Sequence, residues 1–275
     1  MEIEVLSYDK GNPNHIVFRL KDSNPALANA LRRILLMEVP VLAIDEVIIL
    51  ENTTPLYDEI IAHRLGLLPI TTPPGEFNLR EECNCDGHGC TQCEVSLNLE
   101  KESELAGGIE TLFSGEFIPE DPKVKPVIDT VPILRMTNGQ KITIQAIARM
   151  GIGKRHAKWQ SSIASYKYDP IITIDNKKNS NWEEVIKHCP PKILESKDGK
   201  TLSVTNSVDC ILCGLCMEKD ATDSIKVETN GRDFDFTLVS LGQMSVTELL
   251  IQAFSVLKFK AEELKDKIQE LAIQD

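Results

Sequence analysis

Apolar residues at helical spacing make the segment around residues 24–40 the first strong element of the chain. They recur every three or four positions and would form one stripe, made of Leu27, Ala30, Leu31, Ile34 and Leu35. Asp22, Ser23 and Asn24 are candidates for the N-cap, and Pro25 suits the first helical turn, where no N–H donor is needed. Pro40 cannot continue a helix. The pattern therefore predicts an amphipathic helix over 25–39 that carries Arg32 and Arg33.

A second helical pattern occupies the C-terminal end of the chain. Ser245-Val-Thr-Glu248 has the form of a capping box, which starts a helix. Apolar residues then repeat at spacings of four and three: Leu250, Phe254, Leu257, Ala261, Leu264, Ile268 and Leu271. This repeat predicts one helix of about 28 residues, or about 42 Å. So long an apolar seam needs a partner, and packing on the 25–39 helix supplies part of it.

Shorter runs of apolar and β-branched residues predict strands through the rest of the chain. The predicted strands are Ile3–Tyr8, His15–Lys21, 41–51, Val95–Glu100, Thr111–Ile118, Lys141–Met150, Ile171–Ile174 and Ile225–Val227. Thr54-Pro55 is expected to begin a second helix that reaches about Gly66. The run Phe234–Val239 is also strand-like, and Asp233 and Asp235 are expected to be exposed acids on an edge strand. The sequence therefore predicts an α+β protein.

Length and charge narrow the possible functions. The 275 residues suffice for two or three domains. A net charge of −12 argues against a chain that grips nucleic acid by itself, since phosphate binding needs clustered Lys and Arg. No apolar run approaches the roughly 20 residues that cross a membrane, and the start Met-Glu-Ile-Glu-Val does not have the form of a signal peptide. We therefore expect a cytoplasmic protein with no membrane contact.

The eight cysteines form two separate groups, which favours metal sites over disulfides. The first group, Cys83, Cys85, Cys90 and Cys93, consists of two close pairs on Gly-bearing turns. Such pairs can surround one ion tetrahedrally, as structural zinc prefers. His88 could replace one thiolate, and free or disulfide-bonded cysteines are the alternatives.

The second group has the spacing of iron–sulfur ligands. Cys210, Cys213 and Cys216 repeat the triplet of bacterial ferredoxins, and Cys189-Pro190 supplies the remote Cys-Pro. A second ferredoxin repeat would place ligands at Asn179, Trp182, Val185 and Asp220, none of which is a cysteine. We therefore expect a ferredoxin-like domain that keeps one cluster. Its nuclearity is expected to be [4Fe–4S], with [3Fe–4S] as the alternative and zinc as the alternative metal.

Other motifs argue against catalysis by this chain. The basic segment Gly151–Trp159 contains Gly-x-Gly, but it lacks the third glycine and the following helix of a phosphate loop. Nothing in the chain resembles the acidic metal triad of nucleotidyl transfer. We expect no catalytic residues.

Three motifs in order, NALRRILL, DEIIAHRLGLLPI and GIGKRHAKWQ, resemble one family. It is the family of alpha-like assembly subunits of cellular DNA-directed RNA polymerases, in its archaeal form. The resemblance implies a discontinuous dimerisation domain made of residues 1–40 and 225–275. Inserted into it would be a β-rich domain over 41–164, which carries the zinc-type loop, and a ferredoxin-like domain over 165–224.

The same resemblance implies a non-catalytic platform in DNA-directed RNA polymerase, a nucleotidyltransferase complex. The chain would form a heterodimer with the small alpha-like subunit, dock the large catalytic and small accessory subunits, and reach DNA only through the complex. The implied interface residues are Leu31, Ile34, Leu35, Leu250, Phe254, Leu257, Ala261 and Leu264. Arg32 and Arg33 would reach the large catalytic subunit, and 151–159 would form a docking surface.

Two other functions compete with this one. An electron carrier or redox sensor built on the ferredoxin-like domain has no flavin or nicotinamide motif beside it, so its cluster could equally be structural. A zinc-dependent nucleic-acid binder is disfavoured by the net charge.

Overall fold

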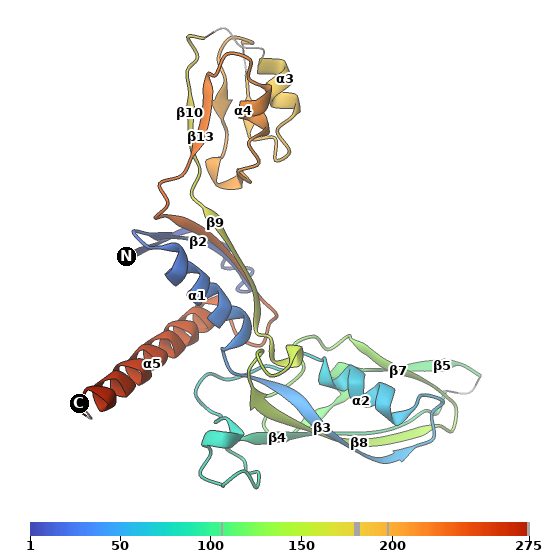
Figure 1. The fold of residues 1–275 in the computed structure, drawn as a ribbon. Helices are drawn as coiled ribbons and strands as arrows, with labels where there is room; N and C mark the ends of the chain where they lie inside the picture. The colour runs from blue at the N-terminus through green and yellow to red at the C-terminus, as the bar shows by residue number, and fades with distance from the viewer. Residues whose placement is uncertain (106, 179–181, 197, 274–275) are drawn as a thin grey trace. The chain divides into compact units, whose positions relative to one another are not determined.

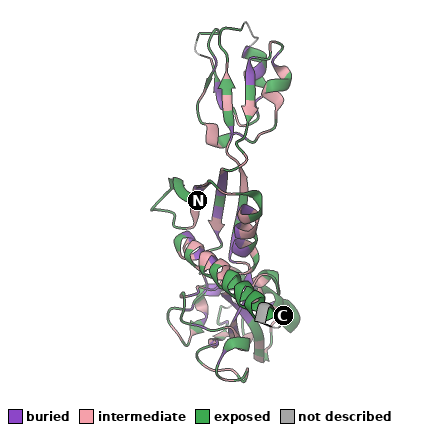
Figure 2. Ribbon diagram, turned by 60° about the vertical axis from the view of Figure 1, so that its left-hand side comes forward, coloured by how far each residue is buried: buried purple, intermediate pink, exposed green. Residues whose placement is uncertain are grey.

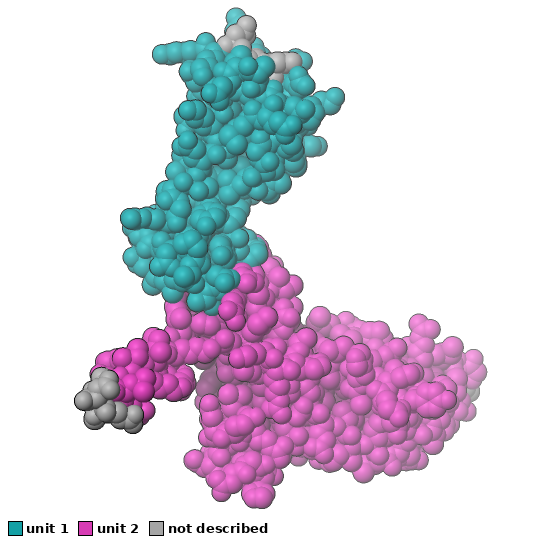
Figure 3. Space-filling model, in the orientation of Figure 1, with its two compact units in different colours: residues 1–8, 16–30, 165–237 teal, residues 9–15, 31–164, 238–275 magenta. Residues whose placement is uncertain are grey.

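The computed structural model describes residues 1–105, 107–178, 182–196 and 198–273, and it mixes helices with strands as the α+β prediction requires (Figure 1). Two compact units divide the chain (Figure 3). They consist of Met1–Tyr8, Ile16–Ala30 and Ser165–Thr237 in one, and of Asp9–His15, Leu31–Ala164 and Leu238–Asp275 in the other. Among the described helices, none has the length and apolar character needed to cross a membrane.

One antiparallel hairpin opens the chain, and both of its strands lie where the sequence predicts them. β1 (Glu2–Tyr8) pairs with β2 (His15–Lys21), with a register shift between Val5 and Ser7. The four-stranded sheet to which they belong has the order β1-β2-β14-β9, where β9 is Ser162–Tyr168 and β14 is Phe234–Ser240. Strands from distant parts of the sequence therefore share one sheet.

The expectation of exposed acids on an edge strand is wrong for Asp235, whereas Asp233 lies just before the strand and is half-buried. β14 lies between β2 and β9, and the Asp235 side chain is only 1% exposed. Its carboxylate accepts hydrogen bonds from Arg19 Nε at 2.7 Å and Arg19 Nη2 at 3.2 Å. Arg19 also pairs with Asp169 at 2.6 Å. The alternating pattern predicted the strand, but it could not reveal a cation on the neighbouring strand.

Both long helices begin as the capping signals predict. α1 spans Pro25–Met37, and the Asn24 side chain accepts a hydrogen bond from Leu27 N at 2.9 Å. α5 spans Val246–Ile273, which is 28 residues. The Ser245 N–H donates to the Glu248 carboxylate at 2.8 Å, and the Glu248 N–H donates to Ser245 Oγ at 3.3 Å, so the capping box is confirmed.

The second unit contains the sheet β3-β8-β4-β6, whose neighbouring strands are antiparallel. β3 is Val41–Asn52, β8 is Lys141–Gly151, β4 is Glu94–Glu102 and β6 is Ile118–Pro119. Helix α2 (Asp58–Gly66) contributes Ile61 and Leu65 to the hydrophobic core of this sheet. α2 begins four residues later than predicted, because the Asn52 side chain accepts from Thr54 N at 3.0 Å and holds that segment in a turn.

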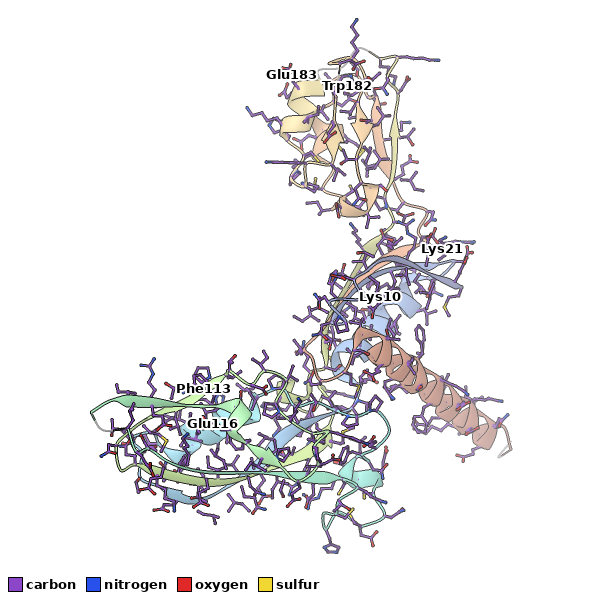
Figure 4. The ribbon with its side chains drawn as sticks, turned by 180° about the vertical axis from the view of Figure 1, so that it is seen from behind. Lys10, Lys21, Phe113, Glu116, Trp182 and Glu183 are labelled. Carbon is purple, nitrogen blue, oxygen red and sulfur yellow. The ribbon has the colours of Figure 1, made fainter. Side chains whose placement is uncertain are left out.

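The predicted strand Thr111–Ile118 is interrupted. β5 (Ile109–Phe113) pairs with β7 (Pro132–Thr137), which the sequence did not predict, and the short 3-10 helix η2 (Ser114–Glu116) follows β5. The Phe113 N–H donates to the Glu116 carboxylate at 2.8 Å across this turn, which Figure 4 labels. Three further 3-10 turns are η1 (Arg80–Glu82), η3 (Ala157–Trp159) and η4 (Ser207–Asp209).

A small subdomain with its own core carries the second cysteine group. The two predicted strands, β10 (Ile171–Ile174) and β13 (Ile225–Glu228), pair with each other, and β11 (Leu194–Glu195) pairs with β12 (Ser203–Val204). Two short helices, α3 (Trp182–Lys187) and α4 (Leu215–Lys219), were not predicted. Trp182 begins α3 (Figure 4), and its indole donates to Lys200 O at 3.0 Å. The core consists of Trp182, Val185, Cys189, Ile193, Leu194, Leu202, Cys210 and Ile225.

The Asp235–Arg19 pair should be a major contributor to stability. Replacing Asp235 with Ala leaves a largely buried guanidinium with only Asp169 as its partner, so we expect a loss of about 3 kcal/mol in the free energy of unfolding. Glu4→Ala removes the exposed pair with Lys21 and should cost less than about 1 kcal/mol. Urea unfolding followed by circular dichroism measures both variants, and equal losses would contradict the argument.

Candidate metal centres

The first cysteine group converges on one point. All four ligand atoms of Cys83, Cys85, Cys90 and Cys93 lie within 4.8 Å of one another. The Sγ–Sγ distances are 3.5 Å for Cys83–Cys90, 3.7 Å for Cys85–Cys93 and 3.9 Å for Cys90–Cys93. A tetrahedral zinc ion with Zn–S bonds of about 2.3 Å requires separations of about 3.8 Å. The loop therefore fits a single tetrahedral ion.

Local backbone geometry shapes this loop. Gly87 and Gly89 have φ of +78° and +90°, which other residues rarely adopt. Arg80 Nε donates to Gly87 O at 2.7 Å, and Cys90 N donates to Cys93 Sγ at 3.4 Å. His88 is exposed and does not belong to the group, so the geometry gives no support to the alternative in which it replaces one thiolate.

The thiols of this group differ in acidity. Burial raises the pKa of Cys93 to about 12, because a buried thiolate loses its hydration. Burial also acts to raise the pKa of Cys85, but hydrogen bonds from the Cys83 thiol and the Gly89 backbone outweigh it and lower the pKa to about 7. An ion bound here would have to displace protons before all four thiolates could hold it.

The second group lines a common pocket. Cys189, Cys210, Cys213 and Cys216 share its wall with apolar side chains that include Ile172, Ile193, Leu194 and Val227. Among the residues that the structure describes, only the first group brings its ligand atoms within 4.8 Å. The four cysteines of the second group thus share one pocket wall, where thiolate sulfur could serve as ligand to a metal centre.

The chain segment around Cys210 is held by a lysine on β9. Lys167 Nζ donates to Cys210 O at 2.7 Å and also donates to Val208 O. Leu212 has φ of +55° and Gly214 has φ of +74°, so the chain turns sharply between the three cysteines. Burial raises the pKa of Cys216, and the neighbouring thiols add to the rise. These thiols would be stabilised as thiolates by a positively charged metal centre.

The positions of the missing second repeat have other tasks. Trp182 and Val185 are 3% and 0% exposed and pack in the core of the subdomain. Asp220 accepts hydrogen bonds from Ile225 N and from the hydroxyl of Thr222, at 2.8 and 2.9 Å. Asn179 lies outside the described residues. At the described positions where a second cluster would need ligands, the residues therefore pack in the core or stabilise a turn.

The residues expected at a partner interface divide into two sets (Figure 2). Leu31, Ile34 and Leu35 are at most 4% exposed and belong to the interior of this chain, whereas Arg33 is exposed and Arg32 is half-buried. On α5, Leu250, Phe254 and Leu257 are half-buried, and Ala261 and Leu264 are exposed. Ile251 and Phe259, which are 60% and 63% exposed, were missed because they lie outside the heptad seam.

The basic segment 151–159 is largely neutralised by acids of the same chain. Arg155 pairs with Glu81 at 3.0 Å, and Lys158 pairs with Asp45 at 2.6 Å. Both cations also lie over the Trp159 ring, at 5.6 and 4.3 Å from its centroid. The segment therefore offers less free positive charge than its sequence suggests.

Comparison with known proteins identifies close relatives. A family model described as RNA polymerase Rpb3/RpoA insert domain matches residues 46–177. The chain is 40% identical to DNA-directed RNA polymerase subunit Rpo3 of Archaeoglobus fulgidus over 272 residues, which cover 98% of each chain. It is 35% identical to the Rpo3 subunit of Methanosphaera stadtmanae over 274 residues, covering 98% of this chain and 99% of the relative. For Methanosarcina mazei Rpo3 the identity is 36% over 267 residues, with 96% and 97% covered.

Zinc binding at the first cysteine group should tighten as the pH rises. The Cys93 thiol, with a pKa of about 12, stays protonated in the metal-free chain and must release its proton to the solvent. Below pH 7 the Cys85 thiol is protonated as well, so each further unit of acidification should cost an additional factor of about ten in apparent affinity. Competition with a chromophoric chelator measures this, and a slope that does not steepen below pH 7 would contradict the assignment.

Proposed function

Because the chain belongs to the archaeal Rpo3 family of DNA-directed RNA polymerase subunits, we propose that it is a non-catalytic assembly subunit that pairs through α5 with the small alpha-like subunit of the polymerase. The large catalytic subunits would then dock on the resulting heterodimer. Membership in the family makes the chain a polymerase subunit. Its role as a platform is our inference from the surfaces that the chain presents.

The exposed second half of α5 carries the proposal. Lys260 pairs with Glu38, and every residue from 261 to 271 beyond it is exposed. Leu264, Ile268 and Leu271 are 61%, 57% and 66% exposed and continue one heptad seam. Burying each such side chain contributes about 1.5–3 kcal/mol, so a second helix along this seam would gain several kcal/mol.

A separate surface on α2 supports docking of further subunits. Tyr57, Ile60 and Leu67 are 74%, 42% and 53% exposed, although the opposite face of the helix lies in the core. Beside them lies a groove of about 470 Å³ lined by Pro55, Leu56, Arg64, Pro132, Leu134 and Arg135. Apolar walls with two arginines suit a partner segment that joins apolar and acidic side chains. Arg33, exposed on α1, is a further candidate contact for a large subunit.

For the metal centres, we propose zinc at Cys83, Cys85, Cys90 and Cys93, and one [4Fe–4S] cluster at Cys189, Cys210, Cys213 and Cys216. The tight convergence of the first group favours a single ion, and the ferredoxin-type spacing of the second group, whose four cysteines line one pocket, favours a cluster. When bound, such a cluster supplies one-electron chemistry and four strong bonds. Those bonds would tie the segment at Cys189 to the segment at 210–216, so that binding energy becomes folding energy.

A redox-responsive role is the second candidate for the cluster. Cys213 is exposed, whereas Cys189 and Cys210 are buried, so one corner of the site meets the solvent. An oxidant or electron carrier could reach the cluster there.

Pairing through α5 is testable by co-expression with the small alpha-like subunit. Ile268→Glu places a charge in the middle of the seam and should weaken pairing at least about tenfold, because a buried carboxylate would lack a partner. Glu262→Lys, on the other side of the same helix, is the matched control and should pair normally. Affinity capture followed by titration gives the constants, and equal pairing of both variants would refute the role of the seam.

The cluster should be dispensable for pairing. Cys210→Ser should lower the iron and sulfide content of anaerobically purified chain from about four atoms of each. It should also destabilise residues of roughly 165–224 in hydrogen exchange, while capture of the small subunit persists. Unchanged iron content would remove Cys210 from the ligand set, and loss of capture would show that the two roles are not separate.

A further inference from the structure

Two acids flank the first cysteine group, and each bonds to a cation at the end of β8 or in the segment that follows it. Glu81 lies in η1, two residues before Cys83, and Glu94 begins β4 immediately after Cys93. Glu81 pairs with Arg155 at 3.0 Å, and Glu94 pairs with Arg149 at 3.0 Å. The cysteine loop is therefore connected at both ends to residues 149–155.

Glu94 makes the stronger of the two connections. One oxygen of its carboxylate lies so close to Gly89 that a Cβ there would overlap it, and the other accepts from Arg149 Nε. Arg149 is only 13% exposed and also bonds to Glu46 at 2.8 Å. By contrast, Glu81 and Arg155 are 66% and 60% exposed, and solvent-exposed pairs of this kind contribute little.

Arg149 is in turn hydrogen-bonded to Trp159. The Trp159 indole donates to Arg149 O at 3.0 Å, and its ring covers Gly151 so closely that a Cβ at that position would overlap it. Lys158 lies over the ring and bonds to Asp45, which also contacts Arg149 at 3.4 Å. One charged network thus joins the cysteine loop to the tryptophan.

The far side of the segment meets the end of α1. Lys154 N donates to Met37 O at 2.8 Å, and an added Cβ at Gly153 would lie 2.8 Å from Leu36 O. The hydroxyls of Ser161 and Ser162 donate to Leu35 O at 3.0 and 2.7 Å. Residues 151–162 therefore bridge the network and the C-terminal end of α1.

We propose that Glu94 is a positioning residue through which an ion at the four cysteines sets the conformation of residues 151–160. The inference rests on the metal site proposed above. A loop with so little regular structure needs its ion to fix the positions of Gly89 and Cys93. Gly89 lies against the Glu94 carboxylate, and Cys93 immediately precedes Glu94 in the sequence. With the loop fixed, the carboxylate holds Arg149, and Arg149 holds the Trp159 indole through its carbonyl group.

Thermodynamic linkage makes the relation reciprocal. If zinc binding stabilises the arrangement of 151–160, then loss of that arrangement must weaken zinc binding by the same factor. Substitutions of residues around a metal site that are not ligands typically cost about 10-fold to 100-fold in affinity. We therefore expect Glu94→Gln to weaken zinc binding about tenfold while leaving the stoichiometry at one ion.

The test uses the full chain labelled with fluorotryptophan, which gives two fluorine NMR signals because the chain has two tryptophans. Trp182→Phe assigns them. After removal of metal with a chelator, zinc alone is titrated back, and bound zinc is counted separately. In the parent chain the Trp159 signal should shift in proportion to zinc while the Trp182 signal stays in place.

Three variants separate the contributions. Glu94→Gln should bind one zinc more weakly and lose most of the Trp159 shift, and Glu81→Gln should differ little from the parent. Glu100→Gln is the matched control, since Glu100 lies on the same strand and forms an exposed ion pair with Lys141 at 3.3 Å. It should behave as the parent does.

The outcomes distinguish the inference from the metal site itself. If one zinc binds and the Trp159 signal does not move, the metal site stands and the positioning role of Glu94 is overturned. The same holds if Glu94→Gln retains both the parent shift and the parent affinity. If no zinc binds to the parent chain, the metal site fails and the inference fails with it.

Discussion

A buried carboxylate on an interior strand constrains the sheet of the first unit. Asp235 is held away from water on β14, and only a cation brought to the same place can offset the cost of its desolvation. That cation is Arg19, which lies 216 positions earlier in the sequence. Burial of this carboxylate is therefore favourable only when β14 and β2, which lie far apart in the sequence, come together in one sheet.

Local sequence signals predicted where helices and strands form, but they did not predict which residues each element packs against. The capping box at Ser245 and the N-cap candidates at 22–24, of which Asn24 is the cap, gave the starts of α5 and α1, because both signals depend on residues close in sequence. The burial of Asp235 depends on a partner far along the chain, and the sequence pattern contains no trace of it. The interruption of the strand at Ser114 has a similar cause, since the Ser114 hydroxyl accepts from Val131 N. The predicted domain boundaries stay predictions.

The grouping of the cysteines was predictable, because their spacing in the sequence already places them near one another. Close pairs such as Cys90 and Cys93 converge on one point, and the triplet at 210–216 lines one pocket together with Cys189. What spacing could not reveal is the surroundings of each loop. The hydrogen bonds from Lys167 and the packing of Glu94 on Gly89 come from residues outside the cysteine motifs, and only the folded chain brings them into contact.

The two long helices show why a burial pattern must be interpreted together with the fold. Leu31 and Leu35 on α1 and Leu264 on α5 look alike in sequence, yet the first two are buried in this chain and the third is 61% exposed. An isolated helical extension gains little from its own backbone, because helices in water derive most of their stability from packing. In the free chain, the apolar side chains beyond Lys260 therefore carry the unfavourable free energy of exposure to water. That free energy is recovered when a partner covers them. Selection for assembly explains an exposed seam of this kind, whereas selection for the stability of the free chain does not.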